Sequence, residues 1–170
     1  MSAKYKSPLS VGVGFGWQIG KTSINASGEW FDAIDPYVVM QGEEFTSQVP
    51  VEVRSFDVVQ ASDDVFNWAV GVGYSLTESI VGYGSFATDY AAVTDDVERA
   101  DLSIAPVDVY SVFLGTEFEA SRARVTLGAG YGWGSRAADR ITDLIGDEEI
   151  EARYVFKRFR LLFGFELITN

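Results

Sequence analysis

The segment from Leu9 to Ile19 alternates, residue by residue, between large apolar side chains and glycine or small polar ones. The apolar set is Leu9, Val11, Val13, Phe15, Trp17 and Ile19, and the other set is Ser10, Gly12, Gly14, Gly16 and Gln18. A period of two residues is typical of a β-strand with unlike faces. The length suits a tilted strand that crosses a bilayer, and glycine replaces the Lys, Glu and Thr of a solvated face. The segment therefore predicts a strand in the wall of a transmembrane β-barrel.

Six further segments alternate in a similar way, at 23–30, 66–76, 79–92, 110–118, 123–133 and 155–167. Tight turns near 20–21, 77–78 and 120–121 alternate with long acidic connections at 33–64, 93–106 and 135–151. Outer-membrane barrels alternate short periplasmic turns with long extracellular loops in this manner. We expect an all-β fold, an antiparallel up-and-down transmembrane β-barrel, with residues 1–170 forming one barrel domain or a C-terminal barrel fragment.

The turns also predict registers. A two-residue turn at Thr77 and Glu78 places Val81 and Tyr83 on the apolar face and turns Phe86 inward, opposite Ala69. A turn at Ala120 and Ser121 sets Phe113 over Gly128 and Glu117 opposite Arg124. The side chains expected to face the barrel interior are Glu29, Phe86, Phe113, Glu117, Arg124, Arg158, Arg160 and Glu166.

Aromatic residues gather where the expected strands meet water. Those near the long connections are Trp30, Trp68, Tyr110, Tyr131 and Trp133, and those near the tight turns are Trp17, Tyr74 and Phe118. Two such levels are typical of the aromatic girdles at the two membrane interfaces. Scattered core aromatics of a soluble β protein are the alternative.

The inward charges have two interpretations. They form a constriction that selects solutes, or they pair in a salt-bridged interior that holds the wall together, which we favour because an inward charge needs a partner. In the first case Arg158 and Arg160 are the side chains that contact a carboxylate, since guanidinium pairs well with carboxylate.

Bacterial barrels have even strand counts, and both of their termini are periplasmic. Here the C-terminus lies on the expected periplasmic side, but the first of seven strands starts on the extracellular side. The start of the chain also lacks the apolar core of a secretory signal. We therefore expect a mature form or the C-terminal portion of a larger barrel, with an N-terminal barrel segment as its missing partner. The alternative is an eight-stranded barrel in which residues 36–60 supply a strand; the pieces YVVM and VPVEVRSF either extend the flanking strands or form a small hairpin.

Composition excludes several classes of function. The chain has no histidine and no cysteine, so Ser–His catalysis, His-ligated metals, thiolate metal sites and disulfides are absent. A net charge of −12 argues against nucleic acid as a partner. The run ending in Gly20, Lys21 and Thr22 lacks the first glycine of a phosphate-binding loop, because Phe15 stands there. We expect no enzyme activity, no cofactor and no metal site.

The third acidic connection contains a carboxylate run, Asp147, Glu148, Glu149 and Glu151, with Asp139 and Asp143 before it. Binding of Ca²⁺ or bridging to lipopolysaccharide phosphates is one reading, but the run lacks calcium-loop spacing, so we favour a solvated loop. The piece DRITDLIGDEE is a candidate for a short helical turn.

Three runs carry a resemblance to a known family: KSPLSVGVGFGWQIGKTSINASGEWFDAIDPY, NWAVGVGYSLTESIVGYGSFATDY and VDVYSVFLGTEFEASRARVTLGAGYGWGS. The chain resembles bacterial outer-membrane barrels, and among them the C-terminal half of the long-chain fatty-acid and toluene transporter type. The resemblance implies a 14-stranded barrel, plugged by an N-terminal segment, that passes hydrophobic molecules. No plug is recognisable here, and no binding residue carries over.

These features together predict a barrel in the outer membrane of a Gram-negative-type bacterium, in contact with lipid and lipopolysaccharide, that lets small and hydrophobic molecules pass. A structural or adhesion barrel with a closed interior is the second hypothesis. A soluble ligand-binding barrel is the third, although such a barrel places bulky apolar residues, and not glycine, inside.

Overall fold

The computed structural model describes residues 3–43, 45–46, 53–54, 57–92, 107–137, 141–142, 149–150 and 153–168. All regular structure in these ranges is β-strand. No helix that could span a bilayer occurs in this part of the chain. The chain divides into two units: the first holds residues 1–11, 30–65 and 92–106, and the second holds 12–29, 66–91 and 107–170.

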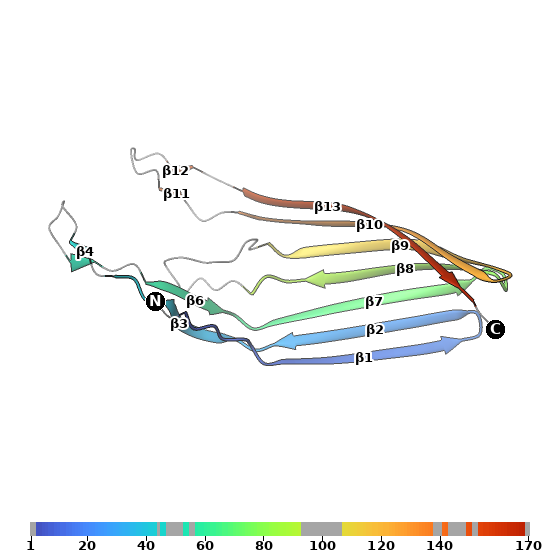
Figure 1. Ribbon diagram of the computed structural model, residues 1–170, viewed down its shortest axis with the longest axis horizontal. Coiled ribbons are helices and arrows are strands. Elements are labelled where there is room, and N and C mark those ends of the chain that lie inside the picture. Colours follow the sequence, from blue (N-terminus) through green and yellow to red (C-terminus); the bar gives the residue numbers. More distant parts are fainter. Residues whose placement is uncertain are drawn as a thin grey trace. The chain divides into compact units, whose positions relative to one another are not determined.

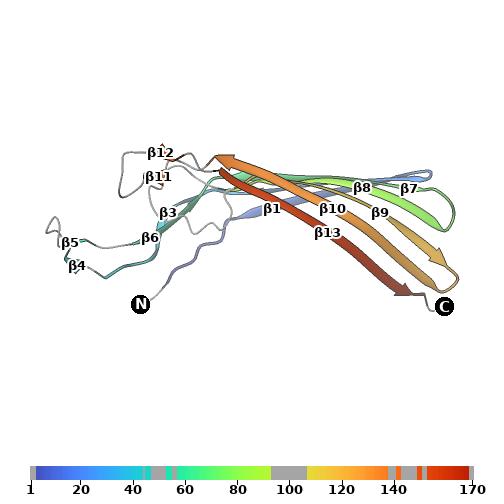
Figure 2. The same cartoon turned by 90° about the horizontal axis from the view of Figure 1, so that it is seen from above.

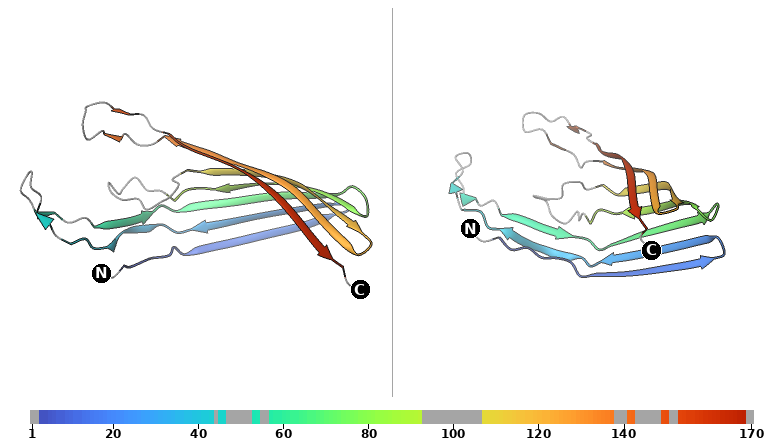
Figure 3. Two further views of the ribbon diagram at one scale, coloured as in Figure 1. Left: turned by 45° about the horizontal axis from the view of Figure 1, so that its top comes forward. Right: turned by 45° about the vertical axis from the view of Figure 1, so that its right-hand side comes forward.

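A seven-stranded sheet contains the longest strands, in the order β1-β2-β7-β8-β9-β10-β13 (Figure 1). Their bounds are β1 Ser10–Ile19, β2 Thr22–Phe31, β7 Val65–Ser75, β8 Ile80–Asp89, β9 Val109–Ala120, β10 Ala123–Ala137 and β13 Arg153–Leu167. The neighbours from β7 to β13 pair antiparallel, and they remain side by side in the other views (Figures 2 and 3). The all-β, up-and-down arrangement of seven strands predicted from the sequence is confirmed.

Short and long connections alternate as predicted. Gly20 and Lys21 join β1 to β2, Leu76–Ser79 join β7 to β8, and Ser121 and Arg122 join β9 to β10. Gly20 has a φ of 57° and Ser121 a φ of 49°, the left-handed backbone that a two-residue hairpin turn requires. The residues at 93–106, and most of those at 138–152, lie outside the described ranges.

The predicted register of β7 with β8 is wrong by one residue. Ser75 pairs with Val81 and Val70 with Phe86, because the connection is not a two-residue turn. The backbone N–H groups of Leu76 and Thr77 both donate to the carbonyl of Ile80, at 2.9 and 3.2 Å. A two-residue hairpin turn requires positive φ at its first central position, as at Gly20 and Ser121, and the β-branched Thr77 adopts that backbone poorly. A slip of one residue exchanges the faces of a whole strand.

Phe86 therefore lies on the face of Val70, and the prediction that it points inward with Ala69 is wrong. Tyr83 and Val81 change places with it, because they pair with Gly73 and Ser75.

The predicted register of β9 with β10 is wrong by two residues, which preserves the faces. The turn lies at Ser121 and Arg122, so Arg124 pairs directly with Glu119, and Phe113 with Gly130. Because a shift of two keeps each side chain on its own side, Glu117 and Arg124 still share a face.

The two faces of this sheet differ in composition. We call one the apolar face; on β7 it carries Phe66, Trp68, Val70, Val72 and Tyr74. The opposite side, the small-residue face, carries Asn67, Ala69, Gly71, Gly73 and Ser75 on that strand. The registers extend both faces through β8, β9, β10 and β13.

On β7 the apolar face is the more exposed of the two. Every β7 residue on it is exposed, whereas every β7 residue on the small-residue face is half-buried or buried. Leu114 is 69% exposed, Phe163 72% and Leu161 77%. Among the described residues no large side chain is fully buried. The sheet therefore has no sealed apolar core on either side.

Aromatic rings cover glycines on the small-residue face. A Cβ placed on Gly128 or Gly130 meets the Phe113 ring at 2.6 Å, and one on Gly115 meets the Tyr83 ring. The Tyr83 and Phe113 rings stack with centroids 6.1 Å apart. Gly14, in the edge strand β1, has open space where a Cβ would stand. Glycine in β10 thus makes room for rings of the neighbouring strand.

The first unit contains a separate pair of strands, β3 Ile34–Met40 and β6 Val58–Ser62, which are antiparallel with two register shifts. The hydroxyl of Tyr37 donates to Oε1 of Gln60 and accepts the N–H of Lys6, each at 3.0 Å. A further pair joins β4 Phe45–Thr46 to β5 Val53–Arg54. A small extra hairpin forms, and the alternative in which residues 36–60 add a strand to the main sheet is wrong.

The helical turn expected at 139–149 is not found at its described positions. Residues Ile141–Thr142 form β11, which pairs antiparallel with β12 at Glu149–Ile150. The remaining positions of that segment lie outside the described residues.

We expect Gly128→Val to lower the free energy of unfolding by about 1–3 kcal/mol, because the new side chain overlaps the Phe113 ring. Urea titration of the protein in detergent micelles, followed by tryptophan fluorescence, measures this. Gly14→Val is the matched control on the same face and should cost much less. Adding Phe113→Ala to Gly128→Val should recover part of the loss; no recovery would contradict the proposed overlap.

Candidate functional site

A charged cluster lies on the small-residue face beside the turn that joins β9 to β10. The guanidinium of Arg124 contacts three carboxylates, those of Glu117, Glu119 and Glu166, each at 3.1 Å. Glu119 and Glu166 are its direct cross-strand partners on β9 and β13. One cation thus ties three strands together, and three carboxylates leave the cluster with an excess of negative charge. The favoured prediction of paired charges holds for this cluster.

Two arginines occupy the other half of β13 on the same face. Arg158 pairs with Gly132 and Arg160 with Gly130. The Arg158 guanidinium lies 5.2 Å from the centroid of the Phe156 ring, a cation–π distance. No described residue forms an ion pair with either arginine. On β13 this face is therefore positive at Arg158 and Arg160, whereas the cluster beside the turn is negative.

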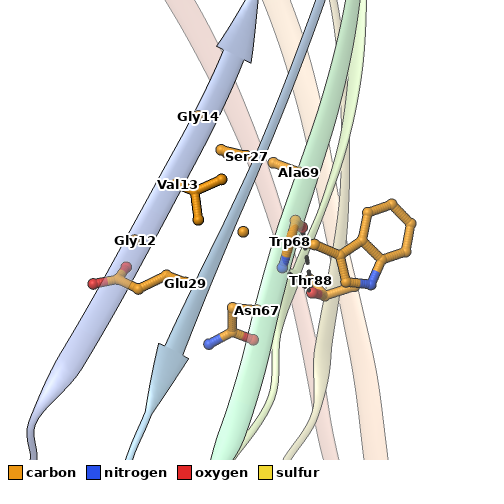
Figure 4. A pocket seen from close by; sticks show the side chains of 10 residues that line it. Gly12, Val13, Gly14, Ser27, Glu29, Asn67, Trp68, Ala69 and Thr88 are labelled. Atoms are coloured by element: carbon orange, nitrogen blue, oxygen red, sulfur yellow. Dashed lines mark hydrogen bonds between the residues drawn. The ribbon is translucent and has the colours of Figure 1, made fainter.

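A shallow hollow of about 430 Å³ lies on the small-residue face at the ends of β1, β2 and β7 (Figure 4). Its polar side chains include Glu29 and Asn67, and Gly12 and Gly14 form its floor. The side-chain oxygen of Asn67 is already hydrogen-bonded, because Oδ1 accepts the backbone N–H of Tyr90 at 2.7 Å. Glu29 has no hydrogen bond or ion pair to a described residue. The hollow offers one carboxylate but no converging set of polar groups.

The apolar face carries an aromatic cluster near the long connections. Phe86 lies at its centre, with ring centroids 5.3 Å from Trp68, 6.3 Å from Tyr110 and 6.4 Å from Trp133. Tyr131 stacks on Trp133 at 6.0 Å. Phe86 thus belongs to this cluster, because the corrected register places it there. Trp30, at the end of β2, belongs to the first unit.

Aromatic side chains also occupy the turn end of the apolar face. Trp17 is 58% exposed, Tyr74 49% and Phe118 39%. The two aromatic levels predicted from the sequence are present on one face, and their placement at membrane interfaces stays a prediction.

Sequence reasoning missed Tyr83 and Glu119 as members of the small-residue face. The prediction placed Tyr83 on the apolar face, because the predicted register of β8 was wrong by one residue. Glu119 stands two residues after Glu117 on β9, so the alternation alone was a usable signal that it shares the face of Glu117. The carboxylates at 139, 143, 147, 148 and 151, considered for Ca²⁺, lie outside the described residues. In the described ranges no group of carboxylates is arranged to hold a metal ion.

No protein-family model matches the chain, and no curated protein matches it.

Replacing the shared cation of the cluster should cost more than replacing one of its anions. Arg124→Gln leaves three carboxylates close together, whereas Glu166→Gln removes one of three partners. We expect a larger fall of the urea midpoint for Arg124→Gln, and partial recovery when Glu119→Gln is added. Equal effects of the two single variants, or no recovery, would show that the ion pairs contribute nothing to stability. High salt should shrink the difference.

Proposed function

We propose that the seven-stranded sheet forms part of the wall of an outer-membrane β-barrel that lets small molecules pass. The apolar face contacts lipid, and the small-residue face lines the interior. Hydrophobic solutes are the class implied by the resemblance to the long-chain fatty-acid and toluene transporter type. A barrel segment from outside this chain completes the wall.

The single observation that carries the proposal is the exposure of the apolar face. Leu161, Phe163 and Leu114 are more than two-thirds exposed, while the glycines behind them are covered. A face of this kind is costly in water, because each fully buried or lipid-covered side chain of this size gains about 1.5–3 kcal/mol. Lipid satisfies such a face without any packed core. A soluble ligand-binding barrel is disfavoured, since it needs these side chains turned inward.

The spacing of the two aromatic levels fits a bilayer. Tyr110 and Phe118 stand at the two levels of β9, eight residues apart, which corresponds to about 27 Å along the strand. With a tilt of about 40°, the levels are separated by roughly 21 Å along the membrane normal, close to the apolar band of about 25 Å in outer-membrane barrels.

The small-residue face supplies the interior surface. Glycine and serine leave space beside β1 and β2, and the charges at its two ends suit contact with water. Solute passage therefore needs no cofactor and no chemical step. Arg158 and Arg160 are the side chains of this surface best suited to meet an anionic group.

A second candidate is a closed structural or adhesion barrel. It is favoured by the stacked rings of Tyr83 and Phe113 and by the Arg124 cluster, which fill space on the small-residue face. Swelling of liposomes that contain the assembled barrel separates the two functions: swelling with small sugars supports passage, and its absence supports the closed barrel.

The facing of the sheet is testable with single cysteines, because the chain has none of its own. An environment-sensitive dye at Val13, Leu127 or Leu161 should report a lipid environment, and the dye at Gly14 or Thr126 should not. Lipids with a quencher in the acyl chain, in membranes of cells that express the chain, provide the measurement. Water-like emission from the dye at Val13, Leu127 and Leu161 would contradict the proposal.

Neighbouring residues of β1 give a matched pair of substitutions. Val13→Arg should lower the free energy of unfolding from lipid vesicles by about 2–4 kcal/mol, because it places a charge on the lipid side. Gly14→Arg changes the opposite face, where a side chain meets open space, and should cost clearly less. Equal losses in vesicles would argue against lipid contact of the apolar face.

A further inference from the structure

The seven-stranded sheet has two edges, formed by β1 and β13. No hydrogen-bonded pairing joins these two strands in the described part of the chain. β13 is 15 residues long and carries a row of exposed apolar side chains, Val155, Phe159, Leu161, Phe163, Phe165 and Leu167. A long, exposed and apolar edge is a template for another strand.

Strand direction restricts what closes the sheet. Because the seven strands alternate in direction, β1 and β13 run the same way, as their arrows in Figure 1 indicate. Direct pairing of β13 with β1, within one chain or between two copies that have the same orientation, would be parallel. Every junction for which a register is known here is antiparallel. An odd number of added strands keeps the closed sheet antiparallel throughout, and bacterial barrels have even totals.

The charge on β13 defines the chemistry of the strand beside it. Arg158 and Arg160 lie on the small-residue face, and their partners on β10 are glycines. The Arg124 cluster stands six residues further along β13, at Glu166, or about 20 Å away. The described strands thus provide no carboxylate at this level, and opposite charges on neighbouring strands stabilise a sheet.

We propose that the strand that pairs with β13 carries carboxylates opposite Arg158 and Arg160, and that it is the first of an odd number of antiparallel strands between β13 and β1. The occupant is a separate stretch of polypeptide with apolar side chains on the other face. This inference rests on the proposed barrel and names the chemistry of the missing segment.

Strand β1, at the other edge, also has no described strand on one side. Gly14, at the middle of β1, has no atom within 4 Å of a built Cβ, whereas Gly128 and Gly130 lie under the Phe113 ring of the strand next to them. The last of the added strands therefore finds room on the small-residue face for a bulky side chain over Gly14.

A second copy of the chain fits less well. Its β1 offers Gly12, Gly14, Gly16 and Gln18 on the small-residue face, with no carboxylate for the arginines. Antiparallel pairing of β13 with β13 of another copy brings Glu166 within reach, but it places the tight turns of one copy beside the long connections of the other. Two copies would then cross one membrane in opposite orientations.

The test uses synthetic peptides added to the full chain in detergent micelles. Three peptides alternate apolar and small residues over the length of β13 and differ only at the two positions that oppose the arginines, with Glu, Gln or Lys. Two opposite-charge cross-strand pairs correspond to about a two- to thirtyfold lower Kd for the Glu peptide than for the Gln peptide. Fluorescence anisotropy of labelled peptide measures Kd.

Variants of the chain locate the effect. Arg158→Gln with Arg160→Gln should abolish the preference, and Arg158→Glu with Arg160→Glu should reverse it in favour of the Lys peptide. Equal binding of all three peptides by the unaltered chain would overturn the proposal, as would a preference that these variants leave unchanged. A dimer in sedimentation that the glutamate variant dissociates would overturn it in favour of a second copy.

The peptide experiment is independent of lipid. A Glu preference together with water-like dye signals at Val13 and Leu161 would leave the edge proposal standing and remove the membrane proposal. Equal binding of the three peptides together with lipid-like dye signals at Val13 and Leu161 would leave the membrane proposal standing and remove the edge proposal.

Discussion

The structure depends on the two-residue period of the pleated strand, which separates each strand into two surfaces that cannot exchange residues. In this chain one surface receives most of the large apolar side chains, and the other receives most of the glycines together with rings such as Tyr83 and Phe113. The apolar side stays exposed, because the side chains of the opposite face point away from it and cannot cover it. The protein therefore needs a covering medium, and its candidate function follows from which medium that is.

Glycine on the small-residue face has a packing role as well as a role in leaving space. Phe113 on β9 lies over Gly128 and Gly130 on β10, and Tyr83 on β8 lies over Gly115 on β9. Each bulky ring on this face is accommodated by the absence of a side chain on the next strand. The face is thus covered in its middle, where ring and glycine alternate between strands, and open at β1, where no described strand lies on one side.

The sequence alone predicted the strands, their order along the chain and the two surfaces, because alternation is a local signal that needs no knowledge of partners. The register of β8 was not predictable in the same way. Its own segment contains Gly82, Gly84 and Ser85 between larger residues, so the faces depend on the connection at Leu76–Ser79. A four-residue connection, in which the backbone N–H groups of Leu76 and Thr77 both donate to the Ile80 carbonyl, replaces the expected two-residue turn, and Phe86 lies in the aromatic cluster as a consequence. The small hairpin of β3 and β6 likewise depends on contacts such as Tyr37 with Gln60, which no periodicity reveals.

In the charged cluster, the alternation of residues along a strand and the pairing of neighbouring strands supply different information about the site. Parity placed Glu117, Arg124 and Glu166 on one face, and the structure adds Glu119 and brings all three carboxylates to one guanidinium. Arg158 and Arg160 share that face by the same parity, yet they lie on the last strand, where one side has no neighbour. Glu166, on the same strand, is satisfied from β10 alone. The difference between these residues is therefore one of position: Glu166 stands opposite Arg124 on β10, whereas Arg158 and Arg160 stand opposite glycines at the edge of the sheet.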